Sequence, residues 1–307
     1  LSTNLILAVG FNASDNPVIQ LKMKQAAEAG AKVVLVNPED YVQHIDFLNK
    51  AVYTKNDLSF LKEVAKAVVD SGRGAGVDGY EAFAASVKDV TVSDDAKAVA
   101  DMYLEAKKAM IVFNQNLITT EAASLLADIA LISGHIGTPR DGILQVKAKN
   151  NSQGLVDLGI TAGAEELEGV KALVVFGEEA DIDTDALEFL AVSDTHMTAL
   201  AAKADVVIPG TGFASTDGTY TNTERRLQLV QAAIEEDVEL ANWEIAAEIA
   251  HVFEVDYEWE NTEDISAAMN DEVPAYKYAV VDEVLGGVLK PADDARLAVI
   301  GDAKFAD

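Results

Sequence analysis

The sequence predicts an α/β protein made of two doubly wound domains, each built around a parallel β-sheet. A strand, a helix and a second strand follow one another within about 30 residues near the N-terminus, which is the spacing of a βαβ unit. The run NLILAVGFN and the later run ALVVFGEEA share a strand-then-glycine pattern. We therefore expect each run to open one α/β half of the chain.

The first βαβ unit is expected between residues 5 and 36. Residues 5–9 form an apolar strand, and a polar turn follows it. Asn16 is the expected N-cap of the next helix, Pro17 its first residue and Gly30 its end. Residues 32–36 then form the second strand. Later in this half we expect helices over residues 57–70, 94–107 and 120–131, the last capped by Thr120, and a strand over residues 110–113.

The second α/β half is expected to contain three short strands and two helices. The strands fall at residues 172–176, 189–192 and 205–208, with a helix at 197–204 between the last two. Residues 210–223 are rich in Gly, Thr and Ser and predict a long loop, whereas residues 239–253 predict an amphipathic helix. We therefore divide the chain into domains 1–160 and 161–255 and an acidic C-terminal extension, 256–307.

Composition excludes several classes of site. The chain has no cysteine, which excludes disulfides and Cys-ligated zinc or iron–sulfur clusters within these residues. Its net charge is −29, and residues 161–307 hold 8 basic and 33 acidic side chains, so this half repels nucleic acid. No apolar stretch approaches the length of a membrane span. The first residues, LSTNLILAVG, lack a basic n-region, so we expect no signal peptide. We expect a cytoplasmic protein and, because it begins with Leu1, a piece of a longer polypeptide.

Most short motifs fail on their context. Gly74, Gly76 and Gly79 match the dinucleotide fingerprint G-x-G-x-x-G, but a helix precedes them where a strand is required. The calcium-loop start at Asp181 lacks the required glycine and glutamate, and the four histidines lack ligand spacing, so no metal site is expected. Residues 10–17 either form an anion-binding turn or an ordinary βα loop. Arg225 and Arg226 either clamp an anion or pair with local carboxylates.

Several segments, taken in order over residues 3–255, resemble the molybdopterin oxidoreductase family. They are LILAVGFNASDNPVI, AKVVLVNP, LLADIALISGHIGTP, KNNSQGLVDLG, ALVVFGEE and MTALAAKADVVIPGTGFASTDGTYTNTERRLQ. The resemblance implies two Rossmann-like domains of the formate dehydrogenase and DMSO reductase type, which hold a molybdenum or tungsten bis(molybdopterin guanine dinucleotide) cofactor. It implies cofactor contacts at Gly10, Asn12, Asp57, Asn151, Gln153, Gly177, Glu178, Asp194, Thr198, Asn222 and Arg225.

The sequence also departs from this family in ways that bear on function. Lys147 stands where formate dehydrogenases place a substrate-binding arginine, and it lacks the planar fork that holds a carboxylate. The strand-end Asp-Pro-Arg is here Asn37-Pro38-Glu39, and a Gly-x-Gly is replaced at residues 114–116 by Asn-Gln-Asn. These departures favour a structural domain without cofactor, like that of the large iron–sulfur subunit of NADH dehydrogenase.

Two alternatives stay open: a fragment of an active molybdenum or tungsten formate dehydrogenase, and an unrelated dinucleotide-binding dehydrogenase. The expected partners are other subunits or domains of a redox complex that carry iron–sulfur clusters.

Overall fold

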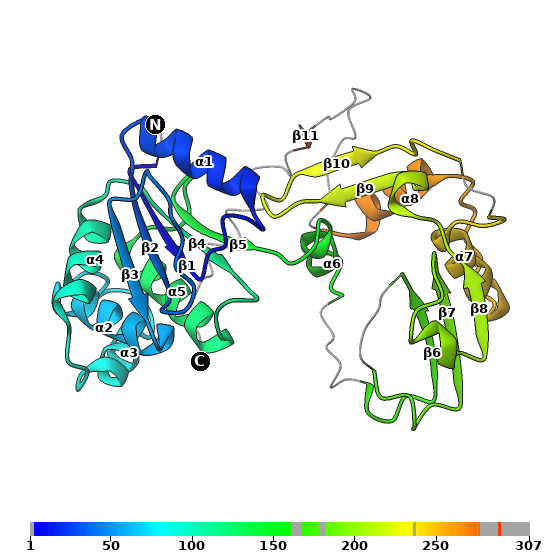
Figure 1. Ribbon diagram of the computed structural model, residues 1–307, viewed down its shortest axis with the longest axis horizontal. Coiled ribbons are helices and arrows are strands. Elements are labelled where there is room, and N and C mark those ends of the chain that lie inside the picture. Colours follow the sequence, from blue (N-terminus) through cyan, green and yellow to red (C-terminus); the bar gives the residue numbers. More distant parts are fainter. Residues whose placement is uncertain are drawn as a thin grey trace. The chain divides into compact units, whose positions relative to one another are not determined.

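The computed structural model describes residues 3–160, 167–177, 182–235, 238–274 and 276, and the backbone of residues 288–289. Contacts along the chain divide it after Ser152 into two compact units, which we describe separately (Figure 1). The domain boundaries predicted at residues 160 and 255 stay predictions, because residues 161–166 lie outside the described part of the chain.

The first unit contains a parallel five-stranded sheet with the order β3-β2-β1-β4-β5. Its strands are β1 (Leu5–Val9), β2 (Lys32–Pro38), β3 (Lys50–Thr54), β4 (Ala109–Asn114) and β5 (Gly142–Val146). The chain builds outward from β1 in one direction and then returns to build in the other, which is the doubly wound order. The α/β prediction is confirmed, although β3 and β5 were not expected.

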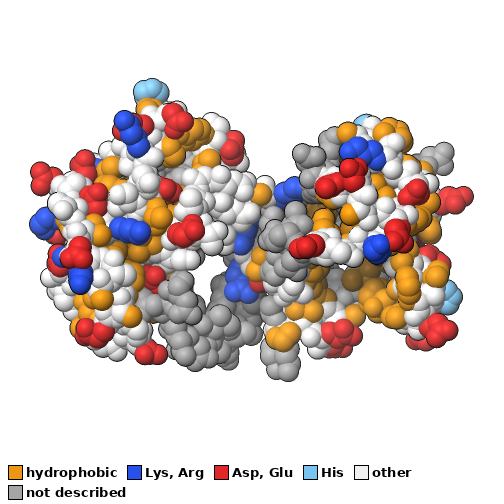
Figure 2. Space-filling view, turned by 90° about the horizontal axis from the view of Figure 1, so that it is seen from below, with side chains coloured by type: hydrophobic (Ala, Val, Ile, Leu, Met, Phe, Trp, Pro, Cys, Tyr) orange, Lys and Arg blue, Asp and Glu red, His pale blue; other side chains and the backbone are white. Residues whose placement is uncertain are grey.

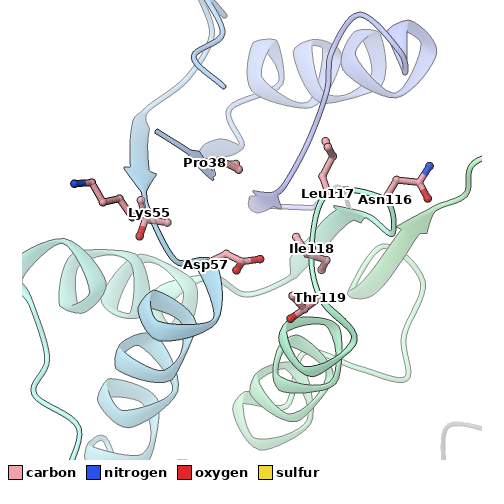
Figure 3. Close-up of a pocket in the computed structure, with 8 residues that line it drawn as sticks. Pro38, Lys55, Asp57, Asn116, Leu117, Ile118 and Thr119 are labelled. Atoms are coloured by element: carbon pink, nitrogen blue, oxygen red, sulfur yellow. The ribbon is translucent and has the colours of Figure 1, made fainter. Parts of the chain in front are cut away.

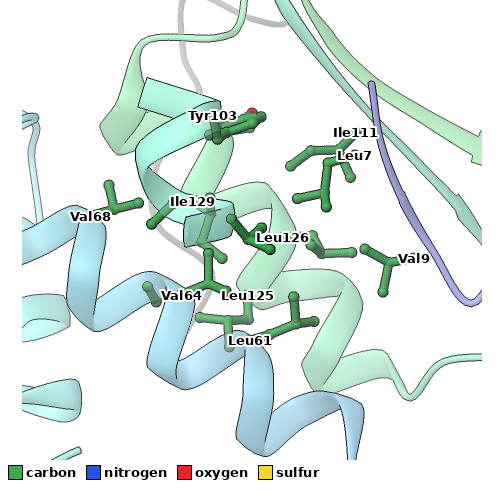
Figure 4. Close-up of a cluster of buried hydrophobic side chains, with 14 of the residues drawn as sticks. Leu7, Val9, Leu61, Val64, Val68, Tyr103, Ile111, Leu125, Leu126 and Ile129 are labelled. Carbon is green, nitrogen blue, oxygen red and sulfur yellow. The ribbon is translucent and has the colours of Figure 1, made fainter. Parts of the chain in front are cut away.

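Helices cover both faces of this sheet (Figure 1). The helices are α1 (Pro17–Glu28), α2 (Asp57–Asp70), α3 (Tyr80–Val87), α4 (Asp94–Glu105) and α5 (Thr120–Ser133). Alternate residues of β1 point to opposite faces, as strand geometry requires. Leu5, Leu7 and Val9 join the core under α2, α4 and α5 (Figure 4), whereas Ile6 and Ala8 pack with Met23 of α1.

Side-chain caps explain where three of these helices begin. Asn56, Ser93 and Thr119 each accept a hydrogen bond from a backbone N–H in the first turn of α2, α4 and α5. Thr119 rather than the expected Thr120 is therefore the cap of α5. Asn16 does not cap α1 with its side chain, because its amide donates instead to the backbone oxygen of Asn12.

The second unit contains a parallel sheet of three strands with the order β6-β7-β8. The strands are β6 (Ala172–Phe176), β7 (Phe189–Asp194) and β8 (Val206–Pro209), close to the predicted ranges. The helix expected over residues 197–204 is instead only the short 3₁₀ turn η2 (Ala201–Lys203). The apolar face of this sheet packs Val175, Leu190 and Val192 against Leu200 and Ala201.

The long loop expected over residues 210–223 is partly structured. It contains the 3₁₀ turn η3 (Phe213–Ser215) and β9 (Gly218–Thr221), which pairs antiparallel with β10 (Leu227–Val230). β11 (Val288–Leu289) adds to β10. The unit also contains α6 (Ser152–Asp157), which begins at the division, α7 (Asn242–Val252) and α8 (Thr262–Glu272). Neither α6 nor α8 was expected.

Candidate functional site

A pocket lies at the carboxyl edge of the first sheet (Figure 3). Its volume is about 320 Å³, and it is lined by Pro38, Thr54, Lys55, Asp57, Asn116, Leu117, Ile118 and Thr119. These residues lie at or just after the ends of β2, β3 and β4. Open parallel sheets bind their ligands at this edge, close to the point where the strand order reverses. The pocket therefore has the position of a ligand site.

Asp57 provides the charged group of this pocket. It is the first residue of α2, and its Oδ1 accepts the N–H of Leu58 at 2.8 Å. In Figure 3 its carboxylate lies in the space between Pro38 and Ile118, whereas Lys55 points away from that space. The Lys55 side chain is 85% exposed. The pocket thus presents an acceptor between two apolar walls, which suits a flat group with N–H donors.

The turn after β1 was the other expected anion site in this unit. Its backbone donors are occupied: the N–H groups of Gly10, Phe11, Ala13, Ser14, Asp15 and Asn16 all donate within the chain. The acceptors include the side chains of Asn37, Gln43 and Asn12. A phosphate bound here would have to displace these bonds. The turn therefore has the hydrogen bonding of an ordinary βα loop.

Gly10 is needed for close packing of the protein itself. Its φ is +54°, and a Cβ on it would lie 2.5 Å from Cγ2 of Ile118 and 3.2 Å from Cβ of Leu117. The loop between β4 and α5 thus packs against the end of β1 and fills the space in which a ligand could otherwise approach Gly10.

Asn37 joins the two neighbouring strand ends. It is 1% exposed; its Oδ1 accepts the N–H of Phe11 at 2.9 Å, and its Nδ2 donates to the oxygen of the same residue at 3.0 Å. The side-chain amide therefore pairs with the backbone of Phe11 as a neighbouring strand would. An aspartate cannot make both bonds, because an ionised carboxylate only accepts.

In the second unit, three predicted site residues lie at the carboxyl edge of the smaller sheet. Gly177 follows β6, Asp194 ends β7, and Thr198 precedes η2. Gly177 has φ +58° and open space around the position of a Cβ. The side chains of Asp194 and Thr198 accept the N–H groups of Thr195 and Ala201. Glu178 lies outside the described residues.

A second group of predicted residues meets around Asp157, which the sequence did not single out. Its Oδ1 accepts hydrogen bonds from Nε2 of Gln153 and from Nη2 of Arg225, both at 2.9 Å. The arginine therefore pairs with a local carboxylate, which was one of its two expected roles. Asn222 uses its side-chain oxygen to hold the β9–β10 turn through the N–H groups of Glu224 and Arg226.

Tyr276 adjoins this group from beyond α8. Its hydroxyl lies 2.6 Å from Oγ1 of Thr221, and both residues are buried. Burial raises the pKa of the Tyr276 phenol. Thr221 lies in the quoted segment that ends in TYTNTERRLQ, whereas no motif marked Tyr276, and the sequence signal for Asp157 was its place in KNNSQGLVDLG.

The remaining predicted residues lie near the end of the first unit. The ammonium of Lys147 donates to Oε1 of Gln145 at 2.7 Å. Asn151 immediately precedes α6 and, like Lys147, belongs to the first unit. Of the predicted cofactor residues that the structure describes, Asp57 alone lines the pocket.

Three further sequence expectations can be compared with the described residues. Gly74 packs against α5, where a Cβ would lie 2.6 Å from the backbone oxygen of Ile132, so its glycine has a packing role. Within the described part of the chain, no group of three His, Asp or Glu side chains is arranged to hold a metal ion. None of the helices in that part has the length and apolar character needed to cross a membrane.

Comparisons with known proteins agree with the parallel-sheet architecture. The sequence profile described as molybdopterin oxidoreductase matches residues 2–252. Formate dehydrogenase H of Escherichia coli K12 is 23% identical over 368 residues, an alignment that covers 95% of this chain and 51% of that protein. The F420-dependent formate dehydrogenase subunit alpha of Methanocaldococcus jannaschii is 25% identical, with 89% and 51% coverage. The chain therefore spans about half the length of these relatives.

A solved structure shares the fold. Acetylene hydratase from Pelobacter acetylenicus superimposes with a TM-score of 0.67 and 14% identity, over 86% of this chain and 49% of that one. At this identity the likeness concerns the arrangement of strands and helices alone.

Proposed function

Because the chain belongs to the molybdopterin oxidoreductase family, we propose that it is the nucleotide-holding α/β part of a formate dehydrogenase-like catalytic subunit. In this proposal the pocket of the first unit accepts the guanine end of a molybdopterin dinucleotide. The observation that carries the proposal is the position of Asp57 inside a pocket at the switch point of the sheet.

The chemistry of the pocket suits guanine better than adenine. Guanine presents two neighbouring N–H donors on one edge, and an aspartate carboxylate can accept both. The corresponding edge of adenine places a ring acceptor beside a single donor, and that acceptor would face the carboxylate. Pro38 and Ile118 supply apolar walls for the faces of a flat ring.

The fit extends only to the base. The turn after β1 uses its backbone donors internally, so it does not fit a pyrophosphate. When bound, the molybdenum or tungsten of such a cofactor supplies two-electron oxidation–reduction chemistry. The residues described here would bind and orient one nucleotide end. The chain has no cysteine, so we place iron–sulfur centres in partner subunits or in other segments, and we propose a cytoplasmic location.

A titration of this chain with GMP tests the proposal. We expect calorimetric binding, with backbone NMR shifts at Asp57 and Thr119 and little binding of AMP. Hydrogen bonds to a charged group contribute about 1.5–3 kcal/mol, so Asp57→Asn should weaken GMP binding by roughly 10- to 100-fold. Asp89→Asn, which removes an exposed carboxylate elsewhere in the unit, is the matched control.

A cofactor-free structural role is the second candidate, favoured by the closed turn at Gly10 and its contact with Ile118. The relatives named above are formate dehydrogenases, and nothing in them favours the NADH dehydrogenase type. If neither GMP nor AMP produces heat or shifts at Asp57, the guanine proposal is wrong and the structural role is preferred.

A further inference from the structure

Residues 252–260, the last residue of α7 and the segment after it, expose apolar side chains among acidic ones. We call them the 252–260 strip. Phe253 is 75% exposed and Val252 78%, and Tyr257 is 48% exposed. Figure 2 shows apolar side chains gathered on the second unit beside acidic ones. Large apolar side chains that stay accessible next to each other mark interaction surfaces more often than scattered ones do.

Apolar and acidic residues alternate along this strip with a period of two. Phe253, Val255, Tyr257 and Trp259 alternate with Glu254, Asp256, Glu258 and Glu260. In extended chain such a pattern places the two kinds of side chain on opposite sides. Phe253 and Glu254 belong to the turn that ends α7, so this argument concerns residues 255–260. The rings of Tyr257 and Trp259 are stacked, with centroids 4.1 Å apart and planes 15° apart, so these two side chains share one side.

The end of α7 fixes the direction in which the strip leaves the helix. The N–H of Val255 donates to the oxygen of Ala250, and that of Glu254 to the oxygen of His251, which is the paired bonding of a helix end. Glu254 has φ +62°, a conformation that favours glycine. The imidazole of His251 also pairs with the carboxylate of Asp256, across the same turn.

Charge decides what kind of partner this strip fits. The chain has a net charge of −29, so a second copy or a nucleic acid would be repelled. Aromatic side chains are typical anchors of protein interfaces, and acidic residues between them complement a basic rim. We propose that the 252–260 strip docks a separate protein that presents an apolar cleft rimmed by lysine or arginine. The strip lies at and beyond the end of the family match, at residue 252, and this proposal does not depend on the guanine pocket.

The emission of Trp259 reports on the strip once Trp243, the other tryptophan, is changed to Phe. The probe is a synthetic amphipathic helix of about 14 Lys and Leu residues, which carries both features of the proposed cleft. We expect a blue shift on binding, about 30-fold weaker binding after Phe253→Ser with Tyr257→Ser, and weaker binding as salt rises from about 50 to 500 mM. Phe213→Ser, at an apolar side chain 88% exposed elsewhere in the unit, should leave binding unchanged.

Four results would overturn the proposal. The first is the absence of any emission shift. The second is that oligolysine of the same charge binds as tightly as the Lys–Leu helix, which would mean that only the acidic charge of the strip matters. The third is sedimentation showing a dimer that Phe253→Ser with Tyr257→Ser dissolves, which would make a second copy the occupant. The fourth is binding to zwitterionic vesicles that the same double variant abolishes. Far-UV circular dichroism of each variant confirms that the fold is intact before binding is compared.

Discussion

Asn37→Asp is the sharpest perturbation that the first unit offers, because it changes one group without changing its size. Asn37 exchanges two hydrogen bonds with the backbone of Phe11 at 2.9 and 3.0 Å, in a site 1% exposed. An aspartate keeps the bond from the N–H and loses the bond to the carbonyl. Its negative oxygen would instead face the carbonyl oxygen of Phe11.

The size of the effect follows from the lost bond and from the new buried charge. A neutral hydrogen bond contributes about 0.5–1.5 kcal/mol, and a buried polar group left without a partner, here the second oxygen of the new carboxylate, costs about 1–3 kcal/mol or more. The carbonyl of Phe11 itself keeps the hydrogen bond from Nε2 of Gln43. We therefore expect Asn37→Asp to lower the free energy of unfolding of the first unit by about 3 kcal/mol at pH 7. Burial should raise the pKa of the new carboxyl above its unfolded value of about 3.9. The loss of stability should accordingly be smallest near pH 4 and grow as the pH rises through the folded-state pKa.

Urea unfolding followed by circular dichroism and by tryptophan fluorescence measures this effect. Trp243 and Trp259 both lie in the second unit, so a dichroism transition without a fluorescence change belongs to the first unit. Asn116→Asp, on the pocket rim, is a control for the added charge. Equal stability of Asn37→Asp and the unchanged chain at pH 7 would refute the reasoning about the paired bonds.

Three further predictions concern single positions. Gly10→Ala should lower the free energy of unfolding of the first unit by about 2–4 kcal/mol, because of the positive φ and the contact with Ile118. Adding Ile118→Ala to that variant should recover about 1–2 kcal/mol. If urea unfolding showed that the effects of the two single variants simply add, the prediction would be contradicted. Glu254→Gly should stabilise the second unit by about 0.5–1 kcal/mol, measured by tryptophan fluorescence, and a loss of stability would argue against strain there. Burial raises the pKa of Tyr103, so above about pH 10 the folded state keeps a proton that the unfolded state releases, and the free energy of unfolding should fall as the pH rises. Tyr103→Phe should reduce this fall in unfolding curves measured at alkaline pH. An unchanged slope would be contrary to expectation.

The sequence predicted the first βαβ unit well because its signals are local. An apolar strand, a proline at the start of a helix and a glycine at its end each act within a few residues, and β1, α1 and β2 appear where they were expected. The strands β3 and β5 were missed because they are short and their side chains are mixed: Lys50 and Tyr53 are half-buried, and β5 begins with a glycine. Their pairing partners, not their composition, make them strands.

The candidate site was predicted only in part for the same reason. Among the pocket residues, Asp57 was expected from the sequence as a cofactor contact, whereas Pro38 and Asn116 were named only as departures from the family pattern. Thr54 and Lys55 were not expected, because their position depends on β3. The contact between Gly10 and Ile118 joins residues 108 positions apart, and no local pattern indicates such an approach. The hairpin at residues 218–230 was hidden for a similar reason, since its turn is held by Asn222.

The central claim is that the pocket beside Asp57 holds the guanine end of a molybdopterin dinucleotide. Acid release of nucleotide from the protein purified from its own organism, together with metal analysis, tests it most directly. The account predicts guanine nucleotide accompanied by molybdenum or tungsten, and much less of both in Asp57→Asn than in Asp89→Asn. A protein that releases neither nucleotide nor metal, or an Asp57→Asn variant that retains both in full, would contradict it.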